Sequence, residues 1–286
     1  MIKIDLPQGS PEWLSFRQGK LSASKAGIIM GLSPYQTPFA LYEEEMGLRD
    51  PQPQRAHMTR GLEIEPLVRN WFNANYGIKV EPAVVQHATN PIFIASLDGL
   101  SDDGKNIVEI KNNNKDYHQM AVDGILPESY LAQVMFQMFV TGLSEAYYIS
   151  HRQGDYAVVE VKRDQVYIDD MIVKLLDFKR RLNEFDPPEL TDRDYEDMSA
   201  DSELERDILL YNTDNRAMKF LKERMDRKME SIKERVGKKN AKGTGWKFTK
   251  YTMKGRLDYE AVPQLQGVDL EEYRKPVSIA YRLTVE

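Results

Sequence analysis

Two acidic residues and a lysine are spaced so that they could share one site. Asp98 follows the apolar run IFIAS, and Glu109 and Lys111 stand two apart in the run IVEIK. Residues i and i+2 of a strand project to the same face, so Glu109 and Lys111 point together while Val108 and Ile110 face the opposite layer. A turn between paired strands would bring Asp98 beside Glu109. Converging carboxylates bind a hard cation such as Mg²⁺, and a neighbouring lysine can hold or deprotonate water, so the set predicts metal-assisted phosphodiester hydrolysis.

The Glu-x-Lys spacing is weak evidence by itself, because a solvated strand face carries the same residue types. The chain contains a second copy, Glu160-Val161-Lys162, whose nearest upstream acid, Asp155, lies in a turn. No separate strand delivers an acid to that copy. We therefore interpret Glu160 and Lys162 as a solvated face, and on the local pattern alone the same alternative stays open for Glu109 and Lys111.

Helical residues before and after these strands could complete the site. Glu63 and Glu65 lie in the segment TRGLEIE, and because they are two apart on a helix only one of them can face the metal. A plain surface glutamate is the alternative. Gln133 and Gln137 stand four apart in the apolar segment LAQVMFQMFV, where a buried amide needs partners. They either bond to buried backbone or line the active site.

Composition excludes several other classes. The chain has 286 residues, a formal net charge of −6 and no cysteine, which excludes disulfide frameworks and cysteine-ligated metals and favours a reducing cytosol. No apolar run approaches the ~20 residues that cross a bilayer, and the N-terminus has no signal-peptide pattern. P-loop, GxGxxG and GxSxG motifs are absent. The four histidines are scattered, so a zinc site is not expected.

Periodicity predicts an α/β fold with a mixed central sheet flanked by helices. Ser10-Pro11 and Thr37-Pro38 are helix starts, and Gly47 and Gly77 are stops. The expected helices cover 11–17, 38–46, 58–76, 129–140 and 164–185. The expected strands cover 79–86, 92–96, 106–111, 146–150 and 156–162.

Consecutive prolines at 187 and 188 predict a domain boundary, because they stop a helix and extend the preceding residue. We assign 1–186 to the core domain and 187–286 to a C-terminal extension. Charge changes there as well: residues 183–214 carry −10 and residues 215–256 carry +11. Apolar residues at 4–3 spacing predict one long helix over 200–236, interrupted by Asn215 and Lys222. A basic and aromatic β segment follows over 237–286.

The basic end of the extension could contact DNA. Lysines alternate with aromatic residues in the segment GKKNAKGTGWKFTKYTMKGR, and Trp246, Lys247 and Lys250 are the candidate contacts. Lysines supply phosphate contacts and aromatic rings can stack on unpaired bases. The alternative, which we rate slightly ahead, is a small β unit with a solvated lysine face and an aromatic core.

Blocks of sequence in a fixed order resemble a known family. The blocks are WLSFR, LSAS, GLSPY, RGLEIE, SLDGL, EIK and YLAQV, spread over residues 9–163. This set is similar to the YqaJ-type viral recombinases, alkaline exonucleases related to phage lambda exonuclease within the PD-(D/E)xK group. The resemblance implies a restriction-endonuclease-like core. Leu97 replaces a common proline and Asn112-Asn113 replaces a common Cys-Pro, and neither change removes a reacting group.

The resemblance also implies roles for particular residues. Asp98, Glu109 and the Ile110 backbone carbonyl resemble the metal ligands, and Glu65 resembles an additional acid beside the metals. Lys111 resembles the residue that activates water, and Gln133 the active-site glutamine. Arg17, Ser24 and Ser96 resemble the group that receives a 5′-phosphate. Their guanidinium and hydroxyl groups are suitable donors for a terminal phosphate.

The implied activity is Mg²⁺-dependent 5′→3′ degradation of one strand of linear duplex DNA, with two ions per site and Mn²⁺ as a substitute. The partners would be double-stranded DNA ends and a single-strand annealing protein, with three chains forming a ring, in the cytoplasm of a bacterial host and encoded by a phage or prophage. Two alternatives remain open: an endonuclease or nickase using the same site, and a non-catalytic DNA-binding recombination protein.

Overall fold

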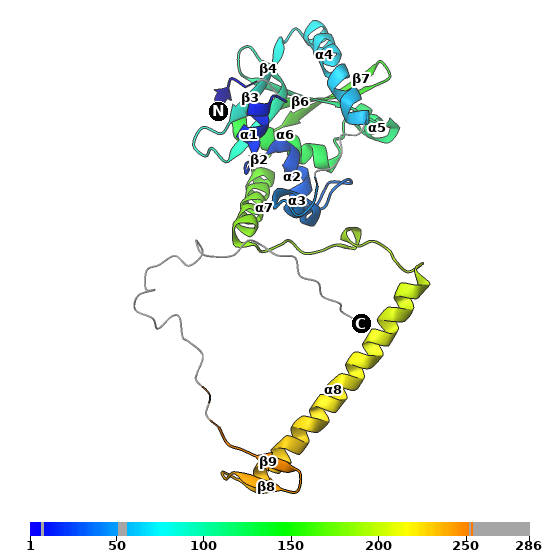
Figure 1. The fold of residues 1–286 in the computed structure, drawn as a ribbon. Helices are drawn as coiled ribbons and strands as arrows, with labels where there is room; N and C mark the ends of the chain where they lie inside the picture. The colour runs from blue at the N-terminus through cyan, green and yellow to red at the C-terminus, as the bar shows by residue number, and fades with distance from the viewer. Residues whose placement is uncertain (7–8, 51–55, 252, 254–286) are drawn as a thin grey trace. The chain divides into compact units, whose positions relative to one another are not determined.

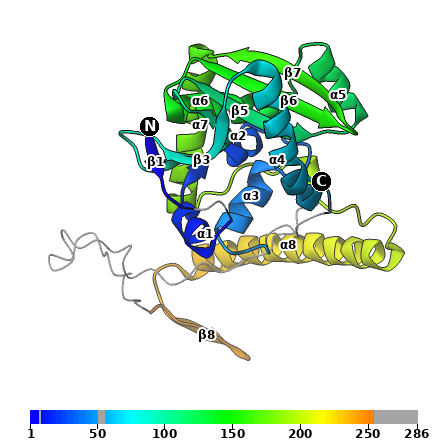
Figure 2. The same ribbon diagram turned by 90° about the horizontal axis from the view of Figure 1, so that it is seen from above.

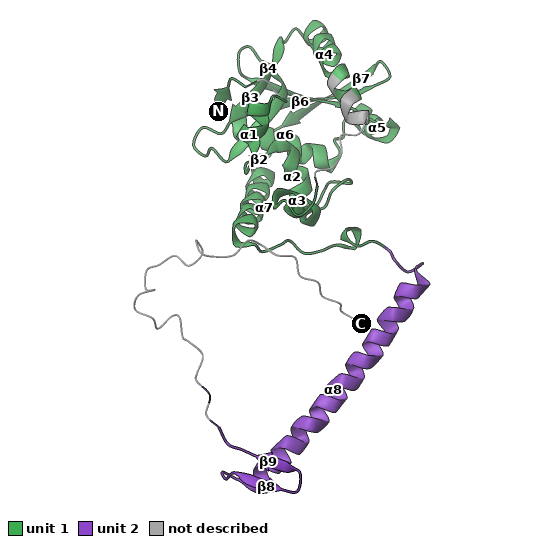
Figure 3. Cartoon of the chain, in the orientation of Figure 1, with its two compact units in different colours: residues 1–196 green, residues 197–286 purple. Residues whose placement is uncertain are grey.

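The computed structural model describes the chain except for residues 7–8, 51–55, 252 and 254–286. Contacts divide the chain into two compact units, residues 1–196 and residues 197–286, which Figure 3 colours separately. No helix in the described ranges combines the length and apolar composition that crossing a bilayer requires.

A seven-stranded mixed sheet forms the centre of the first unit (Figure 1). Its path runs β1-β3-β4-β5-β6-β7, and β2 pairs in parallel with the start of β4. Only β5 and β6 are parallel along the path; the other neighbours are antiparallel. The strands are β1 (Ile2–Ile4), β2 (Leu21–Ser22), β3 (Val80–Gln86), β4 (Phe93–Ser101), β5 (Asn106–Asn112), β6 (Glu145–Arg152) and β7 (Asp155–Lys162).

Helices cover both faces of this sheet, as Figure 2 shows. One core joins the sheet to α2, α6 and α7, and a second core packs Val68 and Phe72 of α4 against Val108 and Ile110 of β5. The parallel β5–β6 pair needs a crossover, which α5 and α6 supply. The helices are α1 (Pro11–Arg17), α2 (Ala23–Ile29), α3 (Pro38–Glu45), α4 (Ala56–Tyr76), α5 (Lys115–Val122), α6 (Glu128–Thr141) and α7 (Gln165–Glu184).

The predicted fold class is confirmed, and every predicted element of the first unit has a counterpart. The side chains of Ser10 and Thr37 accept the N-terminal N–H groups of α1 and α3, as capping requires. The prediction missed β1, β2, α2 and α5, which are all eight residues or shorter. It also ended the strand at 96 too early. Pairing continues to Ser101, so Asp98 lies inside β4 rather than after it.

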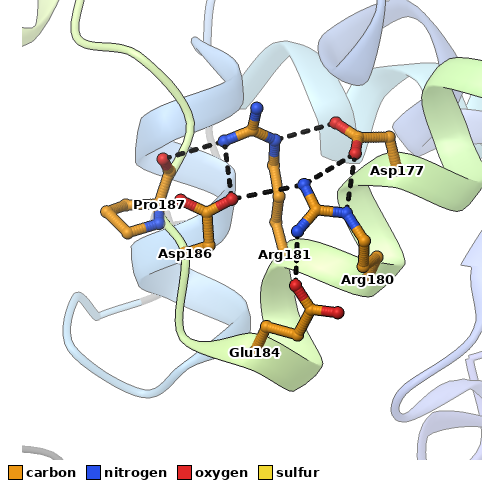
Figure 4. A network of polar contacts seen from close by, with 6 residues as sticks. All are labelled: Asp177, Arg180, Arg181, Glu184, Asp186 and Pro187. Carbon is orange, nitrogen blue, oxygen red and sulfur yellow. Dashed lines mark hydrogen bonds and ion pairs between the residues drawn. The ribbon is translucent and has the colours of Figure 1, made fainter.

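The division between the units falls after Glu196, ten residues beyond the predicted boundary at 186. Figure 4 shows the end of α7, where Arg180 and Arg181 bond to Asp177 and Asp186. The segment beyond the prolines then stays attached to the first unit. Thr37 donates a hydrogen bond to Asp194, and Arg193 donates one to the Ser33 carbonyl at 3.0 Å.

The described part of the second unit consists of one long helix and a hairpin. The helix, α8 (Ser202–Val236), matches the predicted span closely. The hairpin pairs β8 (Ala241–Gly243) with β9 (Trp246–Phe248) inside the predicted β segment, and the remainder of that segment from residue 254 lies outside the described residues. The Trp246 ring lies so close to Gly243 that a Cβ there would be 2.5 Å from it.

Close packing of α2 on α6 provides a test of the fold. A Cβ at Gly27 would lie 2.8 Å from the Ser129 carbonyl oxygen, and backbone cannot move away cheaply. We expect Gly27→Ala to lower the free energy of unfolding by about 1–3 kcal/mol. Gly61→Ala on α4 is the matched control, because among the described residues nothing lies within 4 Å of that position. It should be neutral or stabilising by up to about 1 kcal/mol. Equal destabilisation of the two variants in urea titrations would contradict the packing described.

Candidate active site

A fork between β4 and β5 positions the two predicted metal ligands. The strands pair at Gly99–Val108 and Leu100–Ile107, and the pairing then stops. In this register Asp98 and Glu109 are the next opposed residues. The Ile110 N–H instead donates to Asp98 Oδ2 at 2.8 Å, so a carboxylate takes the place of a ladder carbonyl. The expected approach of the two acids across neighbouring strands is therefore present.

Glu109 is a buried carboxylate with a complete set of donors. Its side chain is 1% exposed. Oε1 lies 2.5 Å from Lys111 Nζ and accepts from Gln133 at 2.7 Å, and Oε2 accepts from Gln137 at 2.5 Å. Both glutamines thus face the acid, and Gln137 also reaches the Ser96 carbonyl at 3.3 Å. Buried charge is tolerated here because it is paired and hydrogen-bonded.

Lys111 lies on the same side of β5 as Glu109. Its ammonium stands 5.4 Å from the Tyr130 ring centre. Burial opposes the charge, but the attraction of Glu109 and Asp98 outweighs it and holds the pKa of Lys111 above its ordinary value. In the arrangement described, Lys111 is therefore a cation that neutralises the acids.

Glu65 rather than Glu63 faces the site. Glu65 lines the same pocket as Asp98, whereas Glu63 is exposed. Arg69, one helical turn further along α4, forms an ion pair with Glu65 and donates to the Asp98 carbonyl at 2.6 Å. Burial and the negative charge of Glu109 raise the pKa of Glu65, although Arg69 opposes the shift.

Asp98 carries the largest electrostatic strain of the three acids. Burial, followed by repulsion from Glu109 and Glu65, raises the pKa of Asp98 well above its ordinary value, although Lys111 and the Ile110 N–H oppose the shift. Crowded acids of this kind favour either a bound proton or a bound cation.

The donor types fit a hard divalent cation, but the acids are engaged elsewhere. Among the residues that the structure describes, no three Asp, Glu, His or Cys side chains form a ready-made metal-binding group. Glu109 is held by Lys111, Glu65 by Arg69 and Asp98 by a backbone N–H. Carboxylate and carbonyl oxygens suit Mg²⁺, so a cation would have to exchange these partners.

One pocket of about 350 Å³ collects all the core residues to which the resemblance assigned a role. The side chain of Ile110 packs in the second core, so the backbone of this residue borders the pocket. The predicted residues on its lining are Arg17, Ser24, Glu65, Ser96, Asp98, Glu109, Ile110, Lys111 and Gln133. Their placement in one pocket agrees with the prediction, and the roles assigned to them stay predictions.

Arg17 forms the end of this pocket nearest α1. It donates to Ser22 and Ser24, each at 3.2 Å, and its guanidinium stacks 4.7 Å from the Trp13 ring. Burial lowers the pKa of Arg17, but the group stays charged at neutral pH. The buried Nε1 of Trp13 has no hydrogen-bond partner in the described part of the chain. A half-buried guanidinium with two hydroxyl groups beside it favours an anion.

Other predicted residues are not among those that line this pocket. Glu160 and Lys162 are exposed on β7, which agrees with the interpretation of that copy as a solvated face. Trp246, Lys247 and Lys250 belong to the second unit, where Trp246 and Lys247 form β9. Trp246 is half-exposed, and the hairpin register puts Lys247 opposite Lys242.

Sequence reasoning did not assign five residues that shape the pocket or its acids: Trp13, Ser22, Arg69, Tyr130 and Gln137. Arg69 is four residues after Glu65, so helical spacing could have indicated their contact. Gln137 was left between two interpretations. It is fully buried and does not line the pocket, but it bonds to the Ser96 carbonyl and to Glu109, which does. Ser22 stands at a helix start, and nothing in the local sequence indicates that its hydroxyl accepts a hydrogen bond from Arg17.

A buried polar network supports β5 immediately beyond Lys111. Asn113 donates to the Tyr148 hydroxyl at 2.7 Å and to Ser150 at 2.8 Å, and His118 lies 2.9 Å from the Ser150 hydroxyl. The Tyr148 ring in turn stacks on Tyr130. Satisfied buried networks fix a single geometry, so these contacts hold the end of the strand that carries Lys111.

The first unit is an α/β domain with a forked mixed sheet and an acid-lined pocket, and its fold is similar to that of a solved nuclease. The alkaline exonuclease LHK-Exo from Laribacter hongkongensis superimposes with a TM-score of 0.54 and 26% sequence identity, over 61% of this chain and 93% of that chain. The complex of LHK-Exo with dAMP gives the same values. The fold is therefore similar to that of the alkaline exonucleases.

Within that class, residues 12–144 match the YqaJ-like viral recombinase domain, which confirms the resemblance seen in the sequence. An uncharacterized protein, YqaJ, from Bacillus subtilis (strain 168) is 31% identical over 171 residues, which are 57% of this chain and 53% of that protein. The chain thus spans about half the length of this curated relative.

The raised pKa of Asp98 gives a testable pH dependence. The folded state binds this proton more tightly than the unfolded chain, so stability falls as pH rises from the ordinary aspartate range through the raised folded-state pKa. Asp98→Asn removes the buried charge and can still accept the Ile110 N–H. At neutral pH without divalent cations, we expect it to raise the melting temperature, by about 2–4 °C for each kcal/mol gained. Asp102→Asn, at an exposed turn, should change little, and a less stable Asp98→Asn protein would contradict the strain described.

Proposed function

We propose that the chain is a Mg²⁺-dependent 5′→3′ exonuclease that degrades one strand of linear double-stranded DNA and leaves 3′ single-stranded overhangs. The observation that carries the proposal is that the acids and Lys111 share one pocket with Arg17, Ser24 and Ser96, which we call the Arg17 group. The similarity to an alkaline exonuclease and to a viral recombinase domain supports it.

The proposed chemistry divides between the acids and Lys111. Asp98, Glu109 and the Ile110 carbonyl would hold the ion, with Glu65 and Gln133 beside them and Mn²⁺ as a substitute. When bound, Mg²⁺ polarises the scissile phosphate and lowers the pKa of bound water. If the ion replaced Lys111 as the partner of Glu109, the Lys111 amine would be free to orient the attacking water or to take its proton. Gln133 and Gln137 hold the Glu109 carboxylate in a fixed orientation.

End recognition would come from the Arg17 group. A guanidinium and hydroxyl groups are suited to a terminal phosphate, which carries more charge than a phosphate within the strand. Ser24 and Ser96 line the pocket with Arg17. LHK-Exo has been solved with dAMP, which supports a phosphate-bearing ligand for this kind of fold.

Assembly and partners are part of the same proposal. The resemblance favours three chains forming a ring around duplex DNA, and an annealing protein that receives the 3′ strand. A net charge of −6 is compatible with a ring, because only the channel lining need be basic.

The two Glu-x-Lys copies provide a matched test of catalysis. We expect Lys111→Ala to lower the rate of strand loss at least 100-fold on linear duplex with Mg²⁺, because the water loses its positioned amine. Lys162→Ala should retain the wild-type rate, because Lys162 is exposed on β7. Omitting Mg²⁺ should abolish the activity of both. Circular dichroism would confirm that Lys111→Ala is folded despite losing the partner of Glu109.

Two results would contradict this proposal. An active Lys111→Ala protein would remove the catalytic role and favour a non-catalytic DNA-binding protein with a contaminating nuclease. Rapid cleavage of closed circular duplex, which offers no end, would favour an endonuclease that uses the same site.

The Arg17 group predicts a dependence on the 5′ end. We expect wild-type protein to degrade 5′-phosphorylated duplex faster than 5′-hydroxyl duplex. Arg17→Ala should lower the rate on the phosphorylated end by about 10- to 100-fold, since a hydrogen bond to a charged group contributes about 1.5–3 kcal/mol. Lys20→Ala is the control, because Lys20 is close in sequence but bonds to the Pro91 carbonyl. Equal wild-type rates on the two ends would remove the phosphate-binding role.

A further inference from the structure

The long helix α8 leaves a continuous apolar stripe without a partner in the described residues. It has 35 residues, about 52 Å at 1.5 Å per residue, and none of its side chains is buried. Met218 and Met225 are 64% and 67% exposed. A helix gains most of its stability from packing an apolar face, so a stripe of this length requires a partner.

The stripe has the spacing of a coiled coil. Residues alternate by four and three positions without a break through five heptads. The d positions are Leu204, Tyr211, Met218, Met225 and Ile232, and the a positions are Ile208, Asn215, Lys222, Met229 and Val236. Two polar residues at a positions lower stability and select register and partner.

We propose that α8 pairs with α8 of a second copy of this chain in an antiparallel two-stranded coiled coil. The inference rests on the second unit alone and is independent of the proposed nuclease function. Antiparallel pairing about the helix centre places Ile208 opposite Ile232 of the second copy and Val236 opposite Leu204. It also places Asn215 opposite Met225 and Lys222 opposite Met218, so no two polar core positions meet.

Flanking charges favour this orientation. The same register brings three residues near the start of α8, Glu205, Asp207 and Asp214, beside Lys233, Arg235 and Lys228 of the second copy, and each pair occurs twice by symmetry. Lys219 is the only charged residue that meets its own counterpart, and on the other flank Leu221 meets its own. Asp207 and Lys233 have exposed partners on their own helix, Arg206 at 3.8 Å and Glu230 at 2.6 Å, and such surface pairs exchange at little cost.

A parallel pair would be electrostatically poorer. It would place Lys222 against Lys222 of the second copy within the core, and Lys228 beside Lys233. Only the Asp214–Lys219 pairs would be attractive. The charge distribution along the unit points the same way: residues 197–214 hold six acidic and one basic residue, whereas residues 227–250 hold two acidic and nine basic residues. Antiparallel alignment brings these opposite charges together, which steers the choice of orientation.

The first test measures the mass of the full chain by light scattering after size exclusion. We expect Ile208→Glu/Ile232→Glu to halve the mass of the wild-type assembly, because the register places these two positions opposite each other and the new carboxylates would repel within the core. Leu209→Glu/Phe220→Glu is the matched control, because these residues are 65% and 58% exposed but lie off the stripe. It should keep the wild-type mass. An unchanged mass for the stripe variant would overturn the proposal, and would assign the stripe to the first unit, to residues 254–286 or to another protein.

The second test determines the orientation of the two helices. Because the chain has no cysteine, any disulfide must join the introduced cysteines. A mixture of Ile208→Cys and Ile232→Cys chains should form a disulfide-linked dimer between the two variants under mild oxidation. Ile208→Cys alone should not, because the two copies would lie about 36 Å apart in the antiparallel pair. A disulfide in Ile208→Cys alone would show parallel pairing and overturn the proposal.

A charge exchange provides an independent check. Asp207→Arg and Arg235→Asp should each weaken dimerisation, and the double variant should restore it, because the pair is re-formed with opposite signs. In a parallel pair these residues do not meet, so failure of the double variant to recover the wild-type mass would contradict the register.

Discussion

The hydrogen bond from the Ile110 N–H to the Asp98 carboxylate is the contact on which the site depends. It occurs where β4 stops pairing with β5 and where the start of β4 pairs with β2 instead. A sheet that stayed paired would leave Asp98 and Glu109 as an ordinary cross-strand pair with no room beside them. By separating, the strands create a space bordered by polar backbone, and the aspartate satisfies the N–H that the separation exposes.

The same fork creates an electrostatic problem that the surrounding helices solve. Three acids converge in a partly buried space, and donors from three elements reach them. Lys111 of β5 and Gln137 of α6 bond to Glu109, Arg69 of α4 bonds to Glu65, and the Ile110 N–H of β5 bonds to Asp98. Removing one donor would leave a buried charge uncompensated, which costs far more than the pair contributes. Contacts from both faces of the sheet thus hold the site. Repulsion among its acids lowers the stability of the fold, as is common at functional sites.

The sequence predicted this site well where the information was local. Strand alternation placed Glu109 and Lys111 on one face, and the predicted helix starts at Pro11 and Pro38 were right because caps act within one turn. The end of β4 was wrong because Asp98-Gly99 looks like a turn, whereas Gly99 is required by contact with Val80 and Val108. The missed α2 and the later unit boundary depend on contacts between distant segments, such as Arg193 with Ser33, which no local pattern contains. Family resemblance, rather than spacing, indicated that Arg17 and Ser24 approach the acids.

The position of the second Glu-x-Lys copy in the sheet indicates a different role for its charged side chains. It lies on β7, the last strand of the path, whose outer edge has no neighbouring strand in the described sheet. An open edge invites strands of other molecules to add to it, and alternating charged side chains are a common protection against such aggregation. Glu160 and Lys162 are exposed charges on this outermost strand, where they oppose such pairing, whereas the same three-residue pattern on the inner strand β5 lines the acidic pocket.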